Sequence, residues 1–379
     1  MNRGFDRSFV CIDGAMNYFG HDPKGRPAPL KLDDQAFIPP EQGFYSTDAF
    51  TDHAIEFVEE ARTRSQPFFL YLAFNAPHWP LQALTQDIEN YRGKYAAGWQ
   101  AIRKARHAKQ IELGLFPADS PIAPMDRGAT EPWNQLSDAQ RAEWGLRMAV
   151  YAAQVDRMDQ NIGRLLDALA RLNIDDNTLV MFISDNGGAA EDPNRSEPGA
   201  QTGTRNSFVG YARPWATVSN TPLRLHKSTV HEGGISAPCI IRWPAVIKPD
   251  RHNTLVSTPA HLIDLMPTCL DIAKANPPAR PLEGVSLAPL LRKDESPAPR
   301  LLFWEHEGNR AVRDGKWKLV QHFGTPWELY DLDADRTESH DLSAQNPQLV
   351  ETLKQHYDTW ARRCGVLPWE NLSATRPSR

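Results

Sequence analysis

Residues 178–188 read TLVMFISDNGG, an apolar run that leads directly into a polar, glycine-rich turn. The run at 179–183 is typical of a buried β-strand, and SDNGG at 184–188 predicts a tight turn at its carboxyl end. In open α/β sheets, ligands gather at the carboxyl ends of strands. Asp185 offers a carboxylate and Asn186 an amide carbonyl, and both are oxygen donors suited to Ca²⁺ or Mg²⁺. Taken alone, the stretch favours an ordinary Asp-Asn-Gly turn.

Two other segments place chemically active side chains beside apolar runs. Residues 68–80 read FFLYLAFNAPHWP, a buried-strand pattern that ends in a polar turn carrying His78. Residues 225–235 read LHKSTVHEGGI and contain Lys227. With the SDNGG turn between them, and in this order along the chain, these segments resemble the sulfatase family, most closely the bacterial arylsulfatases. The resemblance covers most of the chain and extends to YAAQVDRMD at 151–159 and HLIDLMPT at 261–268.

The resemblance implies a fold and a set of residue roles. The implied fold is α/β, with an alkaline-phosphatase-like central mixed sheet flanked by helices and a small C-terminal antiparallel subdomain of sheet and helix. The implied reaction is hydrolysis of a sulfate monoester, in which Asp185 and Asn186 would be ligands of an active-site Ca²⁺. Lys227 would hold a sulfate oxygen, and His78 would donate a hydrogen bond to the sulfate or to its leaving oxygen. The structural alternatives are a histidine packed beside Trp79 and an ordinary surface lysine.

The chain departs from the sulfatase pattern near its N-terminus. Members of the family form a formylglycine nucleophile within a Cys/Ser-x-Pro/Ala-x-Arg motif, and they add an Asp-Asp metal pair and a Gly-Lys-Trp-His stretch. None of these occurs at the expected place, and RGFD at 3–6 resembles the segment that normally follows them. SPAPR at 296–300 and TRPSR at 375–379 match the motif loosely, and we interpret both as chance. We therefore expect a family member that lacks its N-terminal part, including the first strand or strands of the fold.

Three functions stay open at this point. The first is an arylsulfatase-type hydrolase of a small-molecule or glycan sulfate ester, truncated and inactive as given. The second is a non-catalytic remnant or binding protein. The third is a hydrolase of phosphate or phosphonate esters from the alkaline-phosphatase-like superfamily. Because Ca²⁺ takes roughly six to eight oxygen ligands and the resemblance supplies two, we expect weak Ca²⁺ binding. We expect no turnover because the nucleophile is absent, and poor solubility because the missing strand would leave an unpaired sheet edge.

The composition limits the partners that need to be considered. With 379 residues and a formal net charge of −5, the chain can bury a sizeable core, and its charge gives no reason to expect a nucleic acid or an anionic membrane as partner. No apolar run is long enough for a membrane span. No export signal is visible in MNRGFDRSFV at 1–10, so the compartment stays open, although the periplasm or secretion would suit a full-length relative. The oligomeric state is not predicted.

The cysteines are scattered and form neither a CxxC pair nor a zinc spacing. We expect buried free thiols, with one disulfide left open, at Cys11, Cys239, Cys269 and Cys364.

Hydrophobic periodicity predicts the main elements of the larger part of the chain. The expected elements are helices at 46–64 and 137–172 and strands at 68–74, 178–183 and 238–243. A helix at 260–274 is expected to kink at Pro267.

Two N-terminal stretches carry weaker signals. Residues 1–42 look irregular because they are rich in Gly, Pro and Asp. Residues 79–133 form a long polar insertion, a feature that is often functional. Its basic piece RKARH at 103–107 is interpreted as a solvated helical face.

After residue 300 the sequence consists of short apolar runs separated by Gly and Asp turns. Asp314-Gly315 lies between two apolar runs and predicts a hairpin. The expected elements are short strands at 301–304, 311–313, 316–321 and 328–331 and a helix at 346–363. We therefore expect a catalytic α/β domain at 1–298 and an antiparallel subdomain at 299–379.

Overall fold

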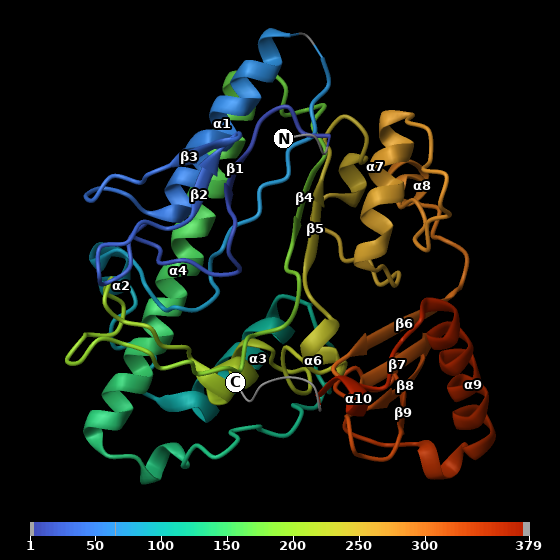
Figure 1. Ribbon diagram of the computed structural model, residues 1–379. Coiled ribbons are helices and arrows are strands. Elements are labelled where there is room, and N and C mark those ends of the chain that lie inside the picture. The colour runs from blue at the N-terminus through green and yellow to red at the C-terminus, as the bar shows by residue number, and fades with distance from the viewer. Residues whose placement is uncertain (1–3, 65, 374–379) are drawn as a thin grey trace. The chain divides into compact units, whose positions relative to one another are not determined.

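The computed structural model describes residues 4–64 and 66–373 (Figure 1). The chain forms two compact units, each built from several segments. The first unit consists of Met1–Ile102, Arg127–Asp176 and Ala189–Trp215. The second consists of Arg103–Asp126, Asn177–Gly188 and Ala216–Arg379.

Two helices organise the first unit, and both agree with the prediction. Helix α4 (Asp138–Arg171) begins at a capping box, in which Ser137 and Gln140 satisfy each other's backbone N–H groups. Helix α1 (Ser46–Thr63) packs along α4. The Arg157 guanidinium of α4 pairs with the Asp48 carboxylate of α1 at 2.6 Å.

Most of residues 4–42 is irregular, as predicted, but the prediction missed three short strands. Three short strands, β1 (Phe9–Cys11), β2 (Leu30–Leu32) and β3 (Gln35–Phe37), form an antiparallel sheet. Phe9 and Leu30 from this sheet join the core formed with Phe50 of α1. The strands are three residues each, which is too short for alternation to be recognised against the surrounding Gly and Pro.

The strand expected at 68–74 is not formed within the described residues. Phe69 is 65% exposed and Tyr71 is 71% exposed, so this apolar run is not the buried strand that its composition predicted. An apolar run becomes a strand only when a neighbouring segment supplies its ladder hydrogen bonds. No such partner is paired with it in the part of the chain that the structure describes.

The insertion at 79–133 contains α2 (Thr85–Glu89), α3 (Gly98–Glu112) and the short turn η1 (Trp133–Gln135). The basic piece on α3 is only partly solvated, which corrects the prediction. Arg103 and His107 are buried, while the three residues between them are exposed. Arg103 Nε donates to Thr221 Oγ1 at 3.2 Å, and His107 Nε2 lies 2.9 Å from the Ser120 carbonyl oxygen.

The second unit contains the strand that leads into the SDNGG turn. Strand β4 (Val180–Ile183) pairs antiparallel with β5 (Cys239–Arg242), and Ile183 lies opposite Cys239. Both strands were predicted. Within the described residues of this unit, the expected central sheet consists of these two strands. The α/β fold class is confirmed.

Helix α7 (Leu265–Ala273) follows the 3-10 turn η3 (Leu262–Asp264). Pro267 therefore lies in the first turn of α7, where its missing N–H is harmless, and the predicted kink is wrong. The other helical segments are α5 (Ala212–Ser219), α6 (Glu232–Ile235), η2 (Pro249–Arg251) and α8 (Ala288–Lys293).

The C-terminal sheet agrees with the prediction. Its strands pair antiparallel in sequence order: β6 (Leu301–His306), β7 (Asn309–Asp314), β8 (Trp317–Gln321) and β9 (Glu328–Asp331). The hairpin between β7 and β8 turns at Gly315, which has φ +55°. Helix α9 (Pro347–Cys364) covers the sheet and packs Leu353 and Tyr357 against Val312 and Leu319. Beyond η4 (Ser343–Gln345) and α9 lies α10 (Trp369–Ser373).

A domain boundary between 298 and 299 stays a prediction. All four cysteines are free thiols, but Cys239 and Cys364 are exposed, so the expected burial is wrong for these two. Among the described residues, no helix combines the length and the apolar character that a membrane crossing requires.

Candidate active site

The turn that follows β4 presents the side chains of Asp185 and Asn186. The Ser184 hydroxyl donates to the Asn186 carbonyl oxygen at 3.0 Å, which closes the turn. The Asn186 amide nitrogen donates to the Gly187 carbonyl oxygen at 2.9 Å, leaving the amide oxygen as the group that could bind a ligand. Asp185 is exposed, and its carboxylate has no hydrogen bond or ion pair within the described residues. Both oxygens are thus presented by one turn.

Backbone hydrogen bonds join this turn to the loop that carries Lys227. The Gly187 N–H donates to the Gly234 carbonyl oxygen at 3.0 Å, and the Lys227 N–H donates to the Gly188 carbonyl oxygen at 3.1 Å. All of these residues belong to the second unit. The structure therefore brings Asp185, Asn186 and Lys227 together, although no sequence spacing relates them.

Glycines make this close approach of the two backbones sterically possible. A Cβ atom at Gly187 would lie 1.8 Å from the Gly233 carbonyl oxygen. At Gly233 it would lie 2.3 Å from the Arg224 carbonyl oxygen, and at Gly234 it would lie 2.0 Å from that of Thr229. The glycines of this turn therefore permit a backbone contact that no residue with a side chain could make.

The loop around Lys227 is held in an uncommon backbone conformation. Leu225 has φ +64° and Ser228 has φ +74°, both in the left-handed region. Such conformations cost about 1–2 kcal/mol per residue and persist only where the surroundings impose them. The geometry at Lys227 is therefore fixed by its contacts and not by local preference.

Three residues that sequence reasoning missed also shape this site. The Asn220 side chain connects the SDNGG turn to the Lys227 loop. Its Oδ1 accepts from the Gly188 N–H at 2.9 Å, and its Nδ2 donates to the Leu225 carbonyl oxygen at 2.9 Å. Buried His226 contacts Asp126 Oδ2 through Nε2 and the Lys227 carbonyl oxygen through Nδ1, both at 3.0 Å.

No sequence signal distinguishes Asn220, His226 or Asp126 from turn and loop residues elsewhere in the chain.

His78 lies in the first unit, whereas the other three predicted residues lie in the second. Its Nδ1 lies 2.8 Å from the Trp79 carbonyl oxygen, and its ring lies 4.6 Å from that of Trp79, centroid to centroid. The Tyr18 hydroxyl donates to the His78 carbonyl oxygen at 2.8 Å and so anchors the turn. His78 is thus packed beside Trp79, as the structural alternative requires. That His78 lies close to Lys227 stays a prediction.

The residues at the SDNGG turn do not by themselves fit a Ca²⁺ ion. Calcium takes roughly six to eight oxygen ligands, and the turn offers the side-chain oxygens of Asp185 and Asn186. Within residues 4–64 and 66–373, no group of three or more His, Cys, Asp or Glu side chains is placed to hold a metal.

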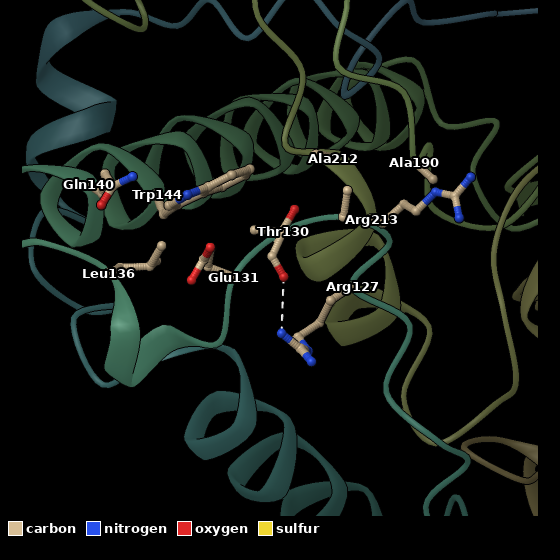
Figure 2. A pocket seen from close by; sticks show the side chains of 10 residues that line it. Arg127, Thr130, Glu131, Leu136, Gln140, Trp144, Ala190, Ala212 and Arg213 are labelled. Atoms are coloured by element: carbon tan, nitrogen blue, oxygen red, sulfur yellow. Dashed lines mark hydrogen bonds between the residues drawn. The ribbon is translucent and has the colours of Figure 1, made fainter.

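A pocket of about 400 Å³ lies elsewhere, in the first unit (Figure 2). Its lining includes Arg127, Trp144 and Arg213, and Arg127 Nη1 donates to the Thr130 carbonyl oxygen at 3.0 Å. The two guanidinium groups point in different directions in Figure 2 and do not converge on one point. None of the predicted site residues lines this pocket.

The first match to the nucleophile motif has a structural explanation. Ser296 is exposed, and its hydroxyl lies 2.9 Å from that of Thr258. The guanidinium of Arg300 pairs with the buried carboxylate of Asp264. The second match, at 375–379, lies outside the described residues, as does Arg3 of the RGFD segment.

Comparison with known proteins gives two family matches. The family described as Sulfatase matches residues 1–275, and the family described as N-sulphoglucosamine sulphohydrolase, C-terminal, matches residues 224–362. The first match begins at residue 1, so it does not support the expectation that the N-terminal part of the domain is missing.

Individual relatives agree with the family matches. An uncharacterized sulfatase of Schizosaccharomyces pombe is 33% identical, covering 100% of this chain and 75% of that protein. The arylsulfatase of Klebsiella aerogenes is 30% identical, covering 76% of this chain and 66% of that protein. The solved structure of Ps i-CgsB in complex with k-i-k-neocarrahexaose is 26% identical with a TM-score of 0.66, covering 95% of this chain and 67% of that one. The chain thus spans about two thirds to three quarters of the length of these relatives.

Proposed function

Because this chain belongs to the sulfatase family, we propose that it provides the sulfate-binding site of an arylsulfatase-type sulfuric ester hydrolase. The observation that carries the proposal is the backbone junction between the SDNGG turn and the Lys227 loop. It joins the backbone segments that carry Lys227, Asp185 and Asn186. The substrate is a sulfate monoester of a small molecule or a glycan.

The proposed chemistry divides between the side chains. Hydrolysis breaks the bond between sulfur and the leaving oxygen, and that oxygen must take up a proton. Lys227 neutralises a sulfate oxygen as a compact positive charge. His78 donates a hydrogen bond to the sulfate or to the leaving oxygen. These roles are electrostatic and positional.

Too few metal ligands and the absence of the nucleophile motif limit the activity that we propose for the chain. Asp185 and Asn186 are the proposed Ca²⁺ ligands, but they do not make a complete site, so we expect weak affinity. The formylglycine motif of the family has no counterpart at the corresponding place in these 379 residues. Groups that act as a catalytic unit lose most of their effect without the nucleophile. We therefore propose that the chain as given binds sulfate and does not turn over sulfate esters.

The test is a nitrophenyl sulfate assay on the purified chain, with and without Ca²⁺. We expect no turnover, and clear turnover that disappears in Asp185→Ala would contradict the incomplete site. Turnover of a phenylphosphonate ester in place of the sulfate would favour the phosphate and phosphonate alternative.

Titration calorimetry with inorganic sulfate tests binding separately from turnover. We expect Lys227→Ala to weaken the affinity about tenfold or more, because a hydrogen bond to a charged group contributes about 1.5–3 kcal/mol. Lys248→Ala is the matched control, since Lys248 is an exposed lysine outside the site. Equal affinities for the two variants would remove Lys227 from the site.

A further inference from the structure

Lys318 on β8 is a lysine with 0% exposure. Its Nζ lies 2.8 Å from Glu232 Oε1 and 2.8 Å from Glu338 Oε1. The contact to Glu232 is also a hydrogen bond. The contact to Glu338 Oε1 is short enough for an ion pair, but its geometry is not that of a hydrogen bond. Burying an ammonium is costly unless opposite charges meet it, and removing one member leaves an uncompensated charge. Each member therefore depends on the other two.

Glu338 links this buried charge cluster, formed by Glu232, Lys318 and Glu338, to the backbone of α6. Its Oε2 accepts a hydrogen bond from the Glu232 N–H at 2.7 Å. Burial opposes the charged form of Lys318, but the two carboxylates outweigh it and raise the pKa of Lys318. The ammonium thus stays charged in the interior.

A second set of contacts joins the same loop to Glu328 on β9 and to its neighbour Tyr330. Arg224 Nη1 lies 3.0 Å from Glu328 Oε2 and donates to the Tyr330 hydroxyl at 2.6 Å. His231 Nε2 lies 2.9 Å from the same oxygen of Glu328. The loop 224–232 is therefore tied to the C-terminal sheet near its start and at its end.

The loop between these anchor points contains the residues with a strained backbone. Leu225 and Ser228 have positive φ on either side of Lys227. The glycine turn that receives the Gly187 N–H directly follows Glu232. An anchored loop can maintain this conformation, whereas a loop released at one end would relax toward ordinary φ values.

We propose that Lys318 and Glu338 are positioning residues for the candidate sulfate site. They hold the Glu232 turn in place and thereby set the position of Lys227 relative to the Asp185–Asn186 turn. The C-terminal sheet thus acts on the site through one buried lysine. This inference rests on the proposed function, which assigns sulfate to Lys227.

Site-resolved hydrogen exchange on the full chain tests the proposal. The reporters are the N–H groups of Gly187 and Lys227, which join the two turns, and that of Gly233, which donates to the Arg224 carbonyl oxygen and closes the loop. The variants are Lys318→Met, which removes the charge at similar length, and Glu338→Gln, which keeps the shape and an acceptor for the Glu232 N–H. Lys316→Met is the matched control, because Lys316 is 46% exposed and pairs with Asp331 at the surface.

In Lys318→Met we expect the three reporters to exchange about tenfold faster or more. The paired amides of β6 and β7 should keep their rates, and Lys316→Met should resemble the unmodified chain. Unchanged reporters would overturn the proposal. An equal rise throughout β6 and β7 would also overturn it, because Lys318 would then be a general stabiliser. If Lys318→Met does not fold, Glu338→Gln decides by the same criteria, with an expected rise of about threefold.

The affinity for inorganic sulfate supplies a second readout. We expect it to fall about fivefold or more in Lys318→Met and to stay unchanged in Lys316→Met. Equal affinities for these two variants would overturn the positioning role. If the unmodified chain does not bind sulfate, the proposed function fails, while the exchange rates still decide whether Lys318 fixes the loop.

Discussion

Replacing Gly187 by alanine should separate the two turns that build the candidate site. The new Cβ would lie 1.8 Å from the Gly233 carbonyl oxygen and 2.9 Å from its carbonyl carbon. Real Cβ contacts are essentially never below 3.0 Å, so the turns must move apart by more than an ångström. The atoms in the way belong to the backbone and cannot rotate aside, and the hydrogen bond from Gly187 to Gly234 is lost with the movement.

The expected cost combines overpacking with that lost hydrogen bond. Overpacking costs about 1–3 kcal/mol and the hydrogen bond about 0.5–1.5 kcal/mol, so Gly187→Ala should lower the free energy of unfolding by about 2–4 kcal/mol. Gly163→Ala is the control, since Gly163 lies inside α4 with nothing within 4 Å of its would-be Cβ. That change should raise stability by about 0.5–1 kcal/mol.

Denaturant unfolding followed by circular dichroism measures both variants. The sulfate affinity of Gly187→Ala should fall as well, because Lys227 moves relative to Asp185. A Gly187→Ala chain as stable as Gly163→Ala, with unchanged sulfate affinity, would refute the reasoning that the glycines lock the site.

Two other predictions concern charged groups, one buried and one partly buried. Arg103→Ala removes a buried guanidinium that donates to Thr221, and it should lower the free energy of unfolding by about 2–4 kcal/mol, while Lys104→Ala on the exposed face should leave it within about 0.5 kcal/mol. Burial alone would raise the pKa of Glu328, but hydrogen bonds from His231 and Arg224 outweigh it and lower that pKa from 4.5 to about 2. Its contribution to stability is therefore complete above about pH 4.5 and is lost as the pH falls toward 2, and Glu328→Gln should flatten this part of a stability profile measured by denaturant titration.

The predictable elements of the fold are those whose signals are local. Helix α4 follows from the apolar spacing at 137–172, and the β7–β8 hairpin follows from Asp314-Gly315. Both depend on residues a few positions apart. The run at 68–74 failed because a strand also needs a partner, which composition does not reveal.

The same distinction applies to the candidate site. Asp185, Asn186 and Lys227 could be named from motifs, but their shared position depends on Asn220 and on backbone contacts between distant turns. The buried state of Lys318 was equally invisible, because its partners are distant in sequence and supplied by tertiary packing.

A crystal structure of the chain with a bound aryl sulfamate, a slowly reacting analogue of an aryl sulfate, tests the central claim most directly. The account predicts a sulfamate oxygen within about 3 Å of Lys227 Nζ, on the side that faces the Asp185–Asn186 turn. An analogue bound elsewhere with Lys227 untouched, for example in the pocket beside Trp144, would contradict it.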